Sequence, residues 1–187
     1  MTGRADRRLS PGSQDADRHW LRLAIELSRC CPPSGSAFSV GAVIVGADGA
    51  VISTGHSREL DSHDHAEEVA LHRAAGRDLG TATLYSSLEP CLMRSSRPVP
   101  CAELVLAAGL RRVVIAWREP PVFVPGGGAA WLADRGVTVA ELPELADEAR
   151  AVNAALPVRG ASGQAAACDR GSHGRGELSA PGADNSP

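Results

Sequence analysis

The chain has 187 residues, of which 43% are hydrophobic and only 3% aromatic. This length suits a single domain, whose core has to be built mainly from Val, Leu, Ile and Ala. The formal net charge of -3 lacks the strong basic excess that is typical of nucleic-acid-binding proteins. Five cysteines, an odd number in a chain of this length, do not resemble a secreted disulfide framework.

Three segments of different composition divide the chain. Residues 1–16 are polar and rich in arginine, and we expect them to form a flexible N-terminal extension. Residues 157–187 are rich in Gly, Ala, Ser and Pro, which predicts a disordered C-terminal tail. The folded domain is expected to run over residues 17–156. Because the first residues lack a signal-like apolar stretch and no apolar run reaches membrane-spanning length, we expect a cytoplasmic protein.

Helical and strand patterns alternate within the expected domain. Helices are predicted at about residues 20–31, 65–75, 102–108, 129–135 and 144–156. Strands are predicted at residues 40–45, 51–54, 83–87, 113–117 and 137–139, the first two joined as a hairpin. Such alternation is typical of an α/β architecture in which helices cover a sheet.

Four residues form a pattern that points to metal chemistry. His65, Cys91 and Cys101 make a sound three-ligand set for zinc, which leaves one tetrahedral position for a water. Zinc lowers the pKa of such a water to about 7. Glu67 follows His65 by two residues and is the expected catalytic residue, which moves protons between that water and the substrate.

Other interpretations of these residues exist. The two cysteines also fit a disulfide or a pair of buried thiols, and a fourth ligand such as His63 or His56 would make the site purely structural. Zinc deaminases carry the signature H-x-E followed by P-C-x-x-C. His65-Ala66-Glu67 and Pro90-Cys91 match it, but nine residues, 92–100, separate the two cysteines.

The segments around these residues resemble a known family. His65-Ala66-Glu67, the stretch 83–91 and the Pro100-Cys101 pair are similar to the riboflavin-biosynthesis pyrimidine deaminases of the cytidine deaminase-like superfamily, whose zinc cysteines are widely spaced. The similarity continues through the stretches 107–116 and 119–137. The resemblance implies a three-layer α/β/α fold with a mixed sheet of about five strands, and Zn2+ as cofactor.

Several positions depart from the pattern of that branch. Its usual substrate-contacting asparagine is Ala37 here, and its usual histidine in the second strand is Ser57. Its histidine after the first zinc cysteine is missing, and Leu92, Met93 and Arg94 stand there. These changes predict a substrate that differs from the standard riboflavin intermediate. The candidate substrate contacts are Ala66, Phe38, Ser57, Arg94 and Arg97.

The sequence therefore predicts a hydrolytic deaminase that acts on an aminopyrimidine-type base, nucleoside or nucleotide. A cytidine, deoxycytidylate or nucleobase deaminase would share the same centre. A member of a different class, a zinc-bound but inactive interaction protein, is the other alternative. The expected partners are a small amino-heterocycle and further copies of the chain in a dimer or tetramer, with no membrane and no nucleic acid.

Overall fold

The computed structural model describes residues 11–120 and 127–156. The predicted tail at residues 157–187 and most of the predicted N-terminal extension lie outside these residues. The predicted end of that extension is wrong by three residues. Helix α1 begins at Gln14, because the Ser13 side chain caps it by accepting a hydrogen bond from the Ala16 N–H at 3.3 Å.

The described chain contains five strands and five α-helices. The strands are β1 (Gly41–Val45), β2 (Val51–His56), β3 (Thr83–Ser86), β4 (Arg112–Ile115) and β5 (Thr138–Glu141). The helices are α1 (Gln14–Ser28), α2 (Ala66–Arg73), α3 (Cys101–Ala107), α4 (Gly128–Ala133) and α5 (Ala146–Val152). The single helix expected over residues 144–156 is a short 3-10 turn, Pro143–Leu145, followed by the seven-residue α5.

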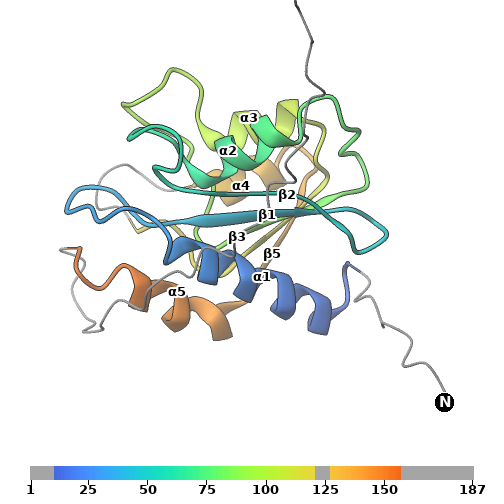
Figure 1. The fold of residues 1–187 in the computed structure, drawn as a ribbon. Coiled ribbons are helices and arrows are strands. Elements are labelled where there is room, and N and C mark those ends of the chain that lie inside the picture. The colour runs from blue at the N-terminus through green and yellow to red at the C-terminus, as the bar shows by residue number, and fades with distance from the viewer. Residues whose placement is uncertain (1–10, 121–126, 157–187) are drawn as a thin grey trace, which may run out of the picture.

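The strands form one mixed sheet in the order β2-β1-β3-β4-β5. Strand β1 pairs antiparallel with both β2 and β3, whereas β3, β4 and β5 run parallel. Helices α2, α3 and α4 cover one face of the sheet, and α1 and α5 cover the other (Figure 1). The predicted three-layer architecture with a five-stranded mixed sheet is confirmed.

The central strands are buried on both faces, as this layering requires. All five residues of β1 and all four of β3 are buried. Helix α2 packs closely on β2 because position 55 is glycine. A Cβ at Gly55 would lie 2.5 Å from the Ala66 carbonyl oxygen and 2.7 Å from the Ala70 nitrogen. This close contact fixes the start of α2, where His65 and Glu67 lie.

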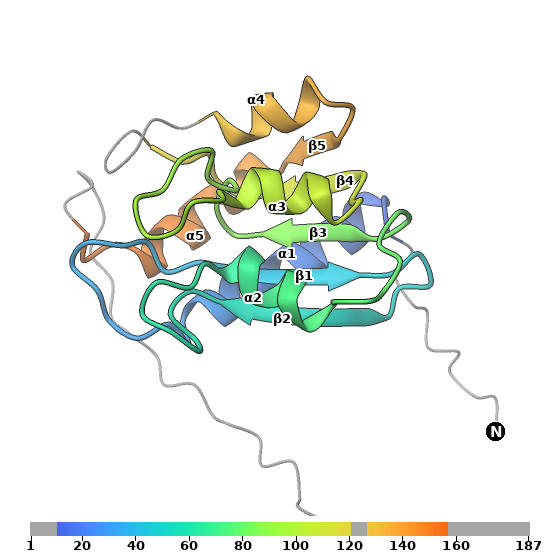
Figure 2. The same ribbon diagram turned by 90° about the horizontal axis from the view of Figure 1, so that it is seen from above.

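The strand register brings four connecting segments to one edge of the sheet. Gly41 at the start of β1 pairs with His56 at the end of β2, and Ala42 pairs with Ser86 at the end of β3. Ser86 in turn pairs with Ile115 at the end of β4. The segments that leave these strand ends meet on one side of the molecule (Figure 2). They are residues 29–40, 57–65, 87–100 and 116–120.

A buried ion pair fastens α1 to the sheet. The Asp17 carboxylate accepts hydrogen bonds from both terminal nitrogens of Arg112, at 3.0 and 2.7 Å, and from the Tyr85 hydroxyl at 2.9 Å. Asp17 is 6% exposed. Through Tyr85 and Arg112, the Asp17 carboxylate links α1 with β3 and β4. Among the described residues, no helix is both long and apolar enough to cross a membrane.

We predict that Asp17→Ala lowers the free energy of unfolding by about 3–5 kcal/mol, because it leaves the Arg112 charge and the Tyr85 hydroxyl without their partner. Denaturant unfolding of the purified variants measures this. Asp15→Ala is the matched control: its side chain is 88% exposed, and its effect should stay within about 0.5 kcal/mol. Equal stabilities of the two variants would contradict the role of the ion pair.

Candidate active site

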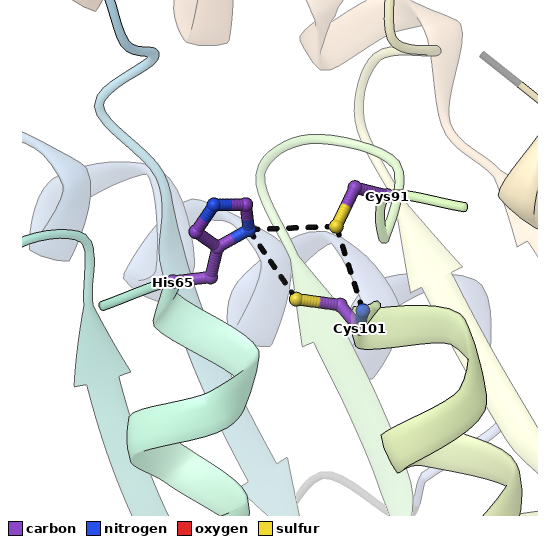
Figure 3. A group of neighbouring side chains, drawn as sticks. All are labelled: His65, Cys91 and Cys101. Carbon is purple, nitrogen blue, oxygen red and sulfur yellow. Dashed lines mark hydrogen bonds between the residues drawn. The ribbon is translucent and has the colours of Figure 1, made fainter. Parts of the chain in front are cut away.

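Three side chains from different segments point toward one another at this sheet edge. His65 immediately precedes α2, Cys91 follows β3, and Cys101 is the first residue of α3 (Figure 3). The Nδ1 atom of His65 lies 3.5 Å from the Cys91 sulfur and 3.4 Å from the Cys101 sulfur. All three donor atoms lie within 4.8 Å of one another. The structure thus brings together the three residues predicted as metal ligands.

This arrangement fits a zinc ion. Zinc–nitrogen bonds of about 2.0–2.1 Å and zinc–sulfur bonds of about 2.3 Å at tetrahedral angles require nitrogen–sulfur separations of about 3.6 Å. The observed separations of 3.5 and 3.4 Å are close to that value. One nitrogen and two sulfur donors are also a chemically suitable set for zinc. The alternative of a disulfide between these cysteines is not what the structure shows, since both are free thiols.

The sulfurs are held by the protein as well as by each other. The Cys101 backbone N–H donates to the Cys91 sulfur at 3.4 Å, and the Ala102 N–H donates to the Cys91 carbonyl at 3.0 Å. The hydrogen bond from the Cys101 thiol, together with the nearby His65, lowers the pKa of Cys91. The pKa of Cys101 is raised because its proton is shared with Cys91 and its thiol is fully buried. The pair therefore favours one thiolate, the form that binds metal.

Glu67 lies beside this cluster and is almost completely buried, at 3% exposure. Its Oε1 atom accepts a hydrogen bond of 2.8 Å from the Ser86 hydroxyl at the end of β3. Burial raises the pKa of the Glu67 carboxyl. A raised carboxyl pKa brings the group closer to the range that suits general acid–base work. Ser86 holds this group in place, and the sequence alone did not single it out.

A cavity of about 540 Å³ opens beside His65, Glu67 and Cys91. All four edge segments contribute to its wall. Of the five predicted substrate contacts, Phe38, Ser57 and Arg94 line the cavity, whereas Ala66 and Arg97 are not among its lining residues. Ala66 is fully buried and packs in the core instead.

Two of the lining residues are engaged by the fold itself. The Ser57 hydroxyl accepts from the Val40 N–H at 3.1 Å, so it joins the loop after β2 to the segment before β1. Phe38 is 8% exposed and packs edge-to-face on Trp117, with ring centroids 5.5 Å apart. Phe38 therefore contributes an apolar side chain to the cavity wall.

The loop between the two cysteines is fastened to α2 by ion pairs. Arg94 Nη1 lies 3.0 Å from one oxygen of Glu68, and Arg97 Nε lies 3.0 Å from the other. Arg97 also donates from Nη2 to Asp64 at 2.9 Å. Both arginines thus have carboxylate partners. Glu68, which the sequence shows only as an acid at a helix start, is the residue that holds them.

Arg58 anchors another wall of the cavity. It is the only described non-glycine residue with a positive φ, 60°. Its guanidinium donates to the carbonyls of Pro32 and Phe38 and to the Ser39 hydroxyl, at distances from 2.8 to 3.1 Å. This side chain thereby fixes the irregular segment before β1, at the cost of a conformation that L-residues rarely adopt.

The buried carboxylate of Glu89 joins three segments behind the cavity. It accepts from the Ala129 N–H at 2.7 Å and from the Glu119 N–H at 2.9 Å. The Glu89 N–H donates to the Trp117 carbonyl at 2.9 Å. Helix α4 can approach because its first residue is Gly128, where a Cβ would lie 1.9 Å from the Pro90 oxygen. Glu89 thus holds the Cys91 segment against the segment that follows β4.

Comparisons with known proteins agree with this geometry. Residues 14–117 match the family model of the cytidine and deoxycytidylate deaminase zinc-binding region. The chain belongs to this deaminase family. Within it, the chain is 37% identical over 133 residues to a diaminohydroxyphosphoribosylamino-pyrimidine deaminase of Schizosaccharomyces pombe, covering 69% of this chain and 33% of that protein.

Solved structures give the same relationship. RibD of Acinetobacter baumannii superposes with a TM-score of 0.66 at 34% identity, over 75% of this chain and 38% of that one. The Rib2 deaminase of Aspergillus oryzae, at 22% identity and a TM-score of 0.64, shares the fold. The chain spans about a third of the length of the curated relatives it matches. The predicted resemblance to riboflavin-type pyrimidine deaminases is confirmed.

We predict that Glu68→Ala lowers the free energy of unfolding by about 1–3 kcal/mol, because it leaves the nearly buried Arg94 without its carboxylate partner. The same change should weaken metal retention during dialysis against a chelator, since the loop that leads to Cys101 loses both of its ion pairs with Glu68 and keeps only that of Arg97 with Asp64. Glu103→Ala, an exposed acid in the first turn of α3, is the control. If Glu68→Ala and Glu103→Ala retain metal equally, the loop does not depend on these ion pairs.

Proposed function

We propose that the protein is a zinc-dependent hydrolytic deaminase that removes an exocyclic amine from an aminopyrimidine-type base, nucleoside or nucleotide. The observation that carries the proposal is the buried Glu67 carboxyl, held by Ser86 beside three converging metal donors. A family member that had lost catalysis would not need a buried acid at this point. The intact Glu67 therefore argues against the alternative of an inactive interaction protein.

His65, Cys91 and Cys101 would hold the metal. Zinc, when bound, supplies a water activated as a nucleophile at neutral pH. Glu67 would accept one proton from the attacking water and deliver it to the ring nitrogen, and would then take the second proton from the new hydroxyl group and deliver it to the departing amine. The carbon–oxygen bond forms, the carbon–nitrogen bond breaks, and ammonia leaves. Burial of Glu67 keeps its carboxyl group ready to take up and release these protons.

The substrate ring is proposed to be an aminopyrimidine, as the names of the relatives suggest. Binding of this substrate is proposed to depend little on a phosphate group. Arg94, which lines the cavity, is paired with Glu68. Ser57 stands in place of a histidine of the riboflavin branch, and its hydroxyl is engaged with Val40. Ala37 offers no polar group. A phosphate would thus meet no unpaired guanidinium in the described wall, because Arg58 is also engaged, with the carbonyls of Pro32 and Phe38.

We also propose that the enzyme works in the cytoplasm on a small molecule and as a homo-oligomer. The net charge of -3 supports a small-molecule substrate over nucleic acid. Sedimentation of the purified chain measures the oligomeric state directly.

We predict that the purified protein contains about one zinc per chain. Elemental analysis by mass spectrometry measures it. The Cys91→Ser, Cys101→Ser double variant should contain almost none, because a hydroxyl is a poor zinc ligand compared with a thiolate. Cys31→Ser is the control, since this free cysteine lies outside the cluster. Full zinc occupancy in the double variant would contradict the ligand assignment.

We predict that the protein releases ammonia from at least one member of a panel of amino-heterocycles. The panel contains 2,5,6-triaminopyrimidin-4-one, its ribosyl 5'-phosphate, cytidine, dCMP and adenine. Glu67→Gln should keep zinc and fold but lose about 10²- to 10⁴-fold in kcat, the usual contribution of a general acid–base group. Ammonia release from no member, or equal rates with Glu67→Gln, would refute the proposed function.

A further inference from the structure

The carboxyl group of Glu119 stands out among the groups of the cavity. Glu119 follows β4 and lines the cavity together with Glu67 and Cys91. Its Oε2 atom is buried and has no hydrogen-bond partner. Buried oxygens without partners are rare in folded proteins, and each one calls for an explanation.

The fold makes use of the backbone at this position but not of the side chain. The Glu119 N–H donates to Glu89, which fixes where the residue sits. The preceding side chain, Arg118, turns away and donates to Glu141 at 2.7 Å. The Glu119 side chain thus extends from a well-held backbone position, yet no described group donates to its buried oxygen.

The surroundings of this carboxyl contain acids rather than donors. Glu67, Glu89 and the Cys91 thiol all lie close to it. The two arginines of the cavity wall direct their donors elsewhere, Arg94 to Glu68 and Val99 and Arg58 to the segment before β1. No described residue donates to the buried Glu119 oxygen, and a ligand in the cavity that Glu119 lines could supply the donor.

We propose that Glu119 is a substrate-binding residue whose carboxyl oxygen accepts a hydrogen bond from an N–H group of the heterocycle other than the amine that leaves. The proposal rests on the proposed deaminase function, since it assumes that the ring binds between Glu67 and Glu119. It narrows the substrate to pyrimidines that carry a second amino group or a ring N–H. A site with a buried acceptor discriminates strongly against rings that lack the matching donor.

Two probes differ in the required group. 2,5,6-Triaminopyrimidin-4-one keeps amino and ring N–H groups besides any amine that it loses. Cytidine has no N–H group other than its 4-amine. Glu119 should therefore favour the first probe and contribute nothing to binding of the second.

The experiment compares the affinities of Glu67→Gln with those of the double variants Glu67→Gln, Glu119→Ala and Glu67→Gln, Glu119→Gln. Because Glu67→Gln removes turnover, titration calorimetry with the zinc-loaded proteins measures equilibrium binding. We expect Glu119→Ala to weaken binding of triaminopyrimidinone by about 10- to 100-fold, the loss typical of one hydrogen bond to a carboxyl group. Glu119→Gln should recover part of it, since its amide oxygen still accepts. Binding of cytidine should be unchanged or equally undetectable.

Further measurements separate this role from a structural one. Because no described residue donates a hydrogen bond to the buried Glu119 Oε2 atom, both Glu119 variants should melt at or above the temperature of the intact protein. In the otherwise intact enzyme, Glu119→Ala should raise KM for triaminopyrimidinone and change kcat little. Arg118→Ala, which alters the neighbouring residue outside the cavity wall, is the matched control.

Equal affinities for triaminopyrimidinone with and without Glu119, or no binding to Glu67→Gln at all, would overturn the proposal. So would a fall in melting temperature of several degrees in both Glu119 variants. If the affinities differ as expected but the intact chain releases no ammonia from any compound, Glu119 binds the ring and the deaminase function is the part that fails. If the protein releases ammonia at the same rate with and without Glu119, the deaminase function is supported and the role of Glu119 is refuted.

Discussion

The active-site edge depends on one buried carboxylate, that of Glu89. Glu89 lies between the end of β3 and Cys91, and each of its carboxylate oxygens accepts a hydrogen bond from a backbone N–H of another segment. Because a buried charge without donors is costly, these segments must meet for the carboxylate to be accommodated. The position of Cys91, the direction of the chain after β4 and the start of α4 are therefore set together. Glu89 thus positions both the metal ligand Cys91 and the cavity-wall residue Glu119.

The arginines around the cavity show how a long loop can carry a metal ligand. The residues between Cys91 and Cys101 contain no helix or strand, so their own backbone gives little rigidity. Pairing of Arg94 and Arg97 with Glu68 attaches the loop to the same helix that begins beside His65. The ion pairs thus hold the loop next to the start of α2, where His65 lies. In this chain, the positive charges near the site serve mainly to position the loop.

Residue type pointed to the metal donors, and the alternation of helical and strand patterns predicted a sheet covered by helices. The three layers and the mixed five-stranded sheet were implied by the resemblance to the riboflavin-type deaminases. His65, Cys91 and Cys101 have few other uses in such a pattern, and hydrophobic periodicity shows where the strands lie. The roles of Ser86 and Glu89 depend on contacts between segments distant in the chain, which periodicity does not encode. The assignment of Arg97 to substrate binding illustrates the same point, because its partner Asp64 was not visible from spacing alone.

The connections between the strands also differ in length at the two ends of the sheet. Long connections leave the sheet on the side of the metal donors, and the opposite edge carries short ones, such as the Gly46–Gly49 turn between β1 and β2 (Figure 2). Changes at that opposite edge do not touch the metal donors or the residues that line the cavity. A fluorophore or peptide tag inserted at the Gly46–Gly49 turn would thus report on the protein without entering its chemistry. The fold thus provides a labelling site on the side of the sheet opposite to the candidate active site.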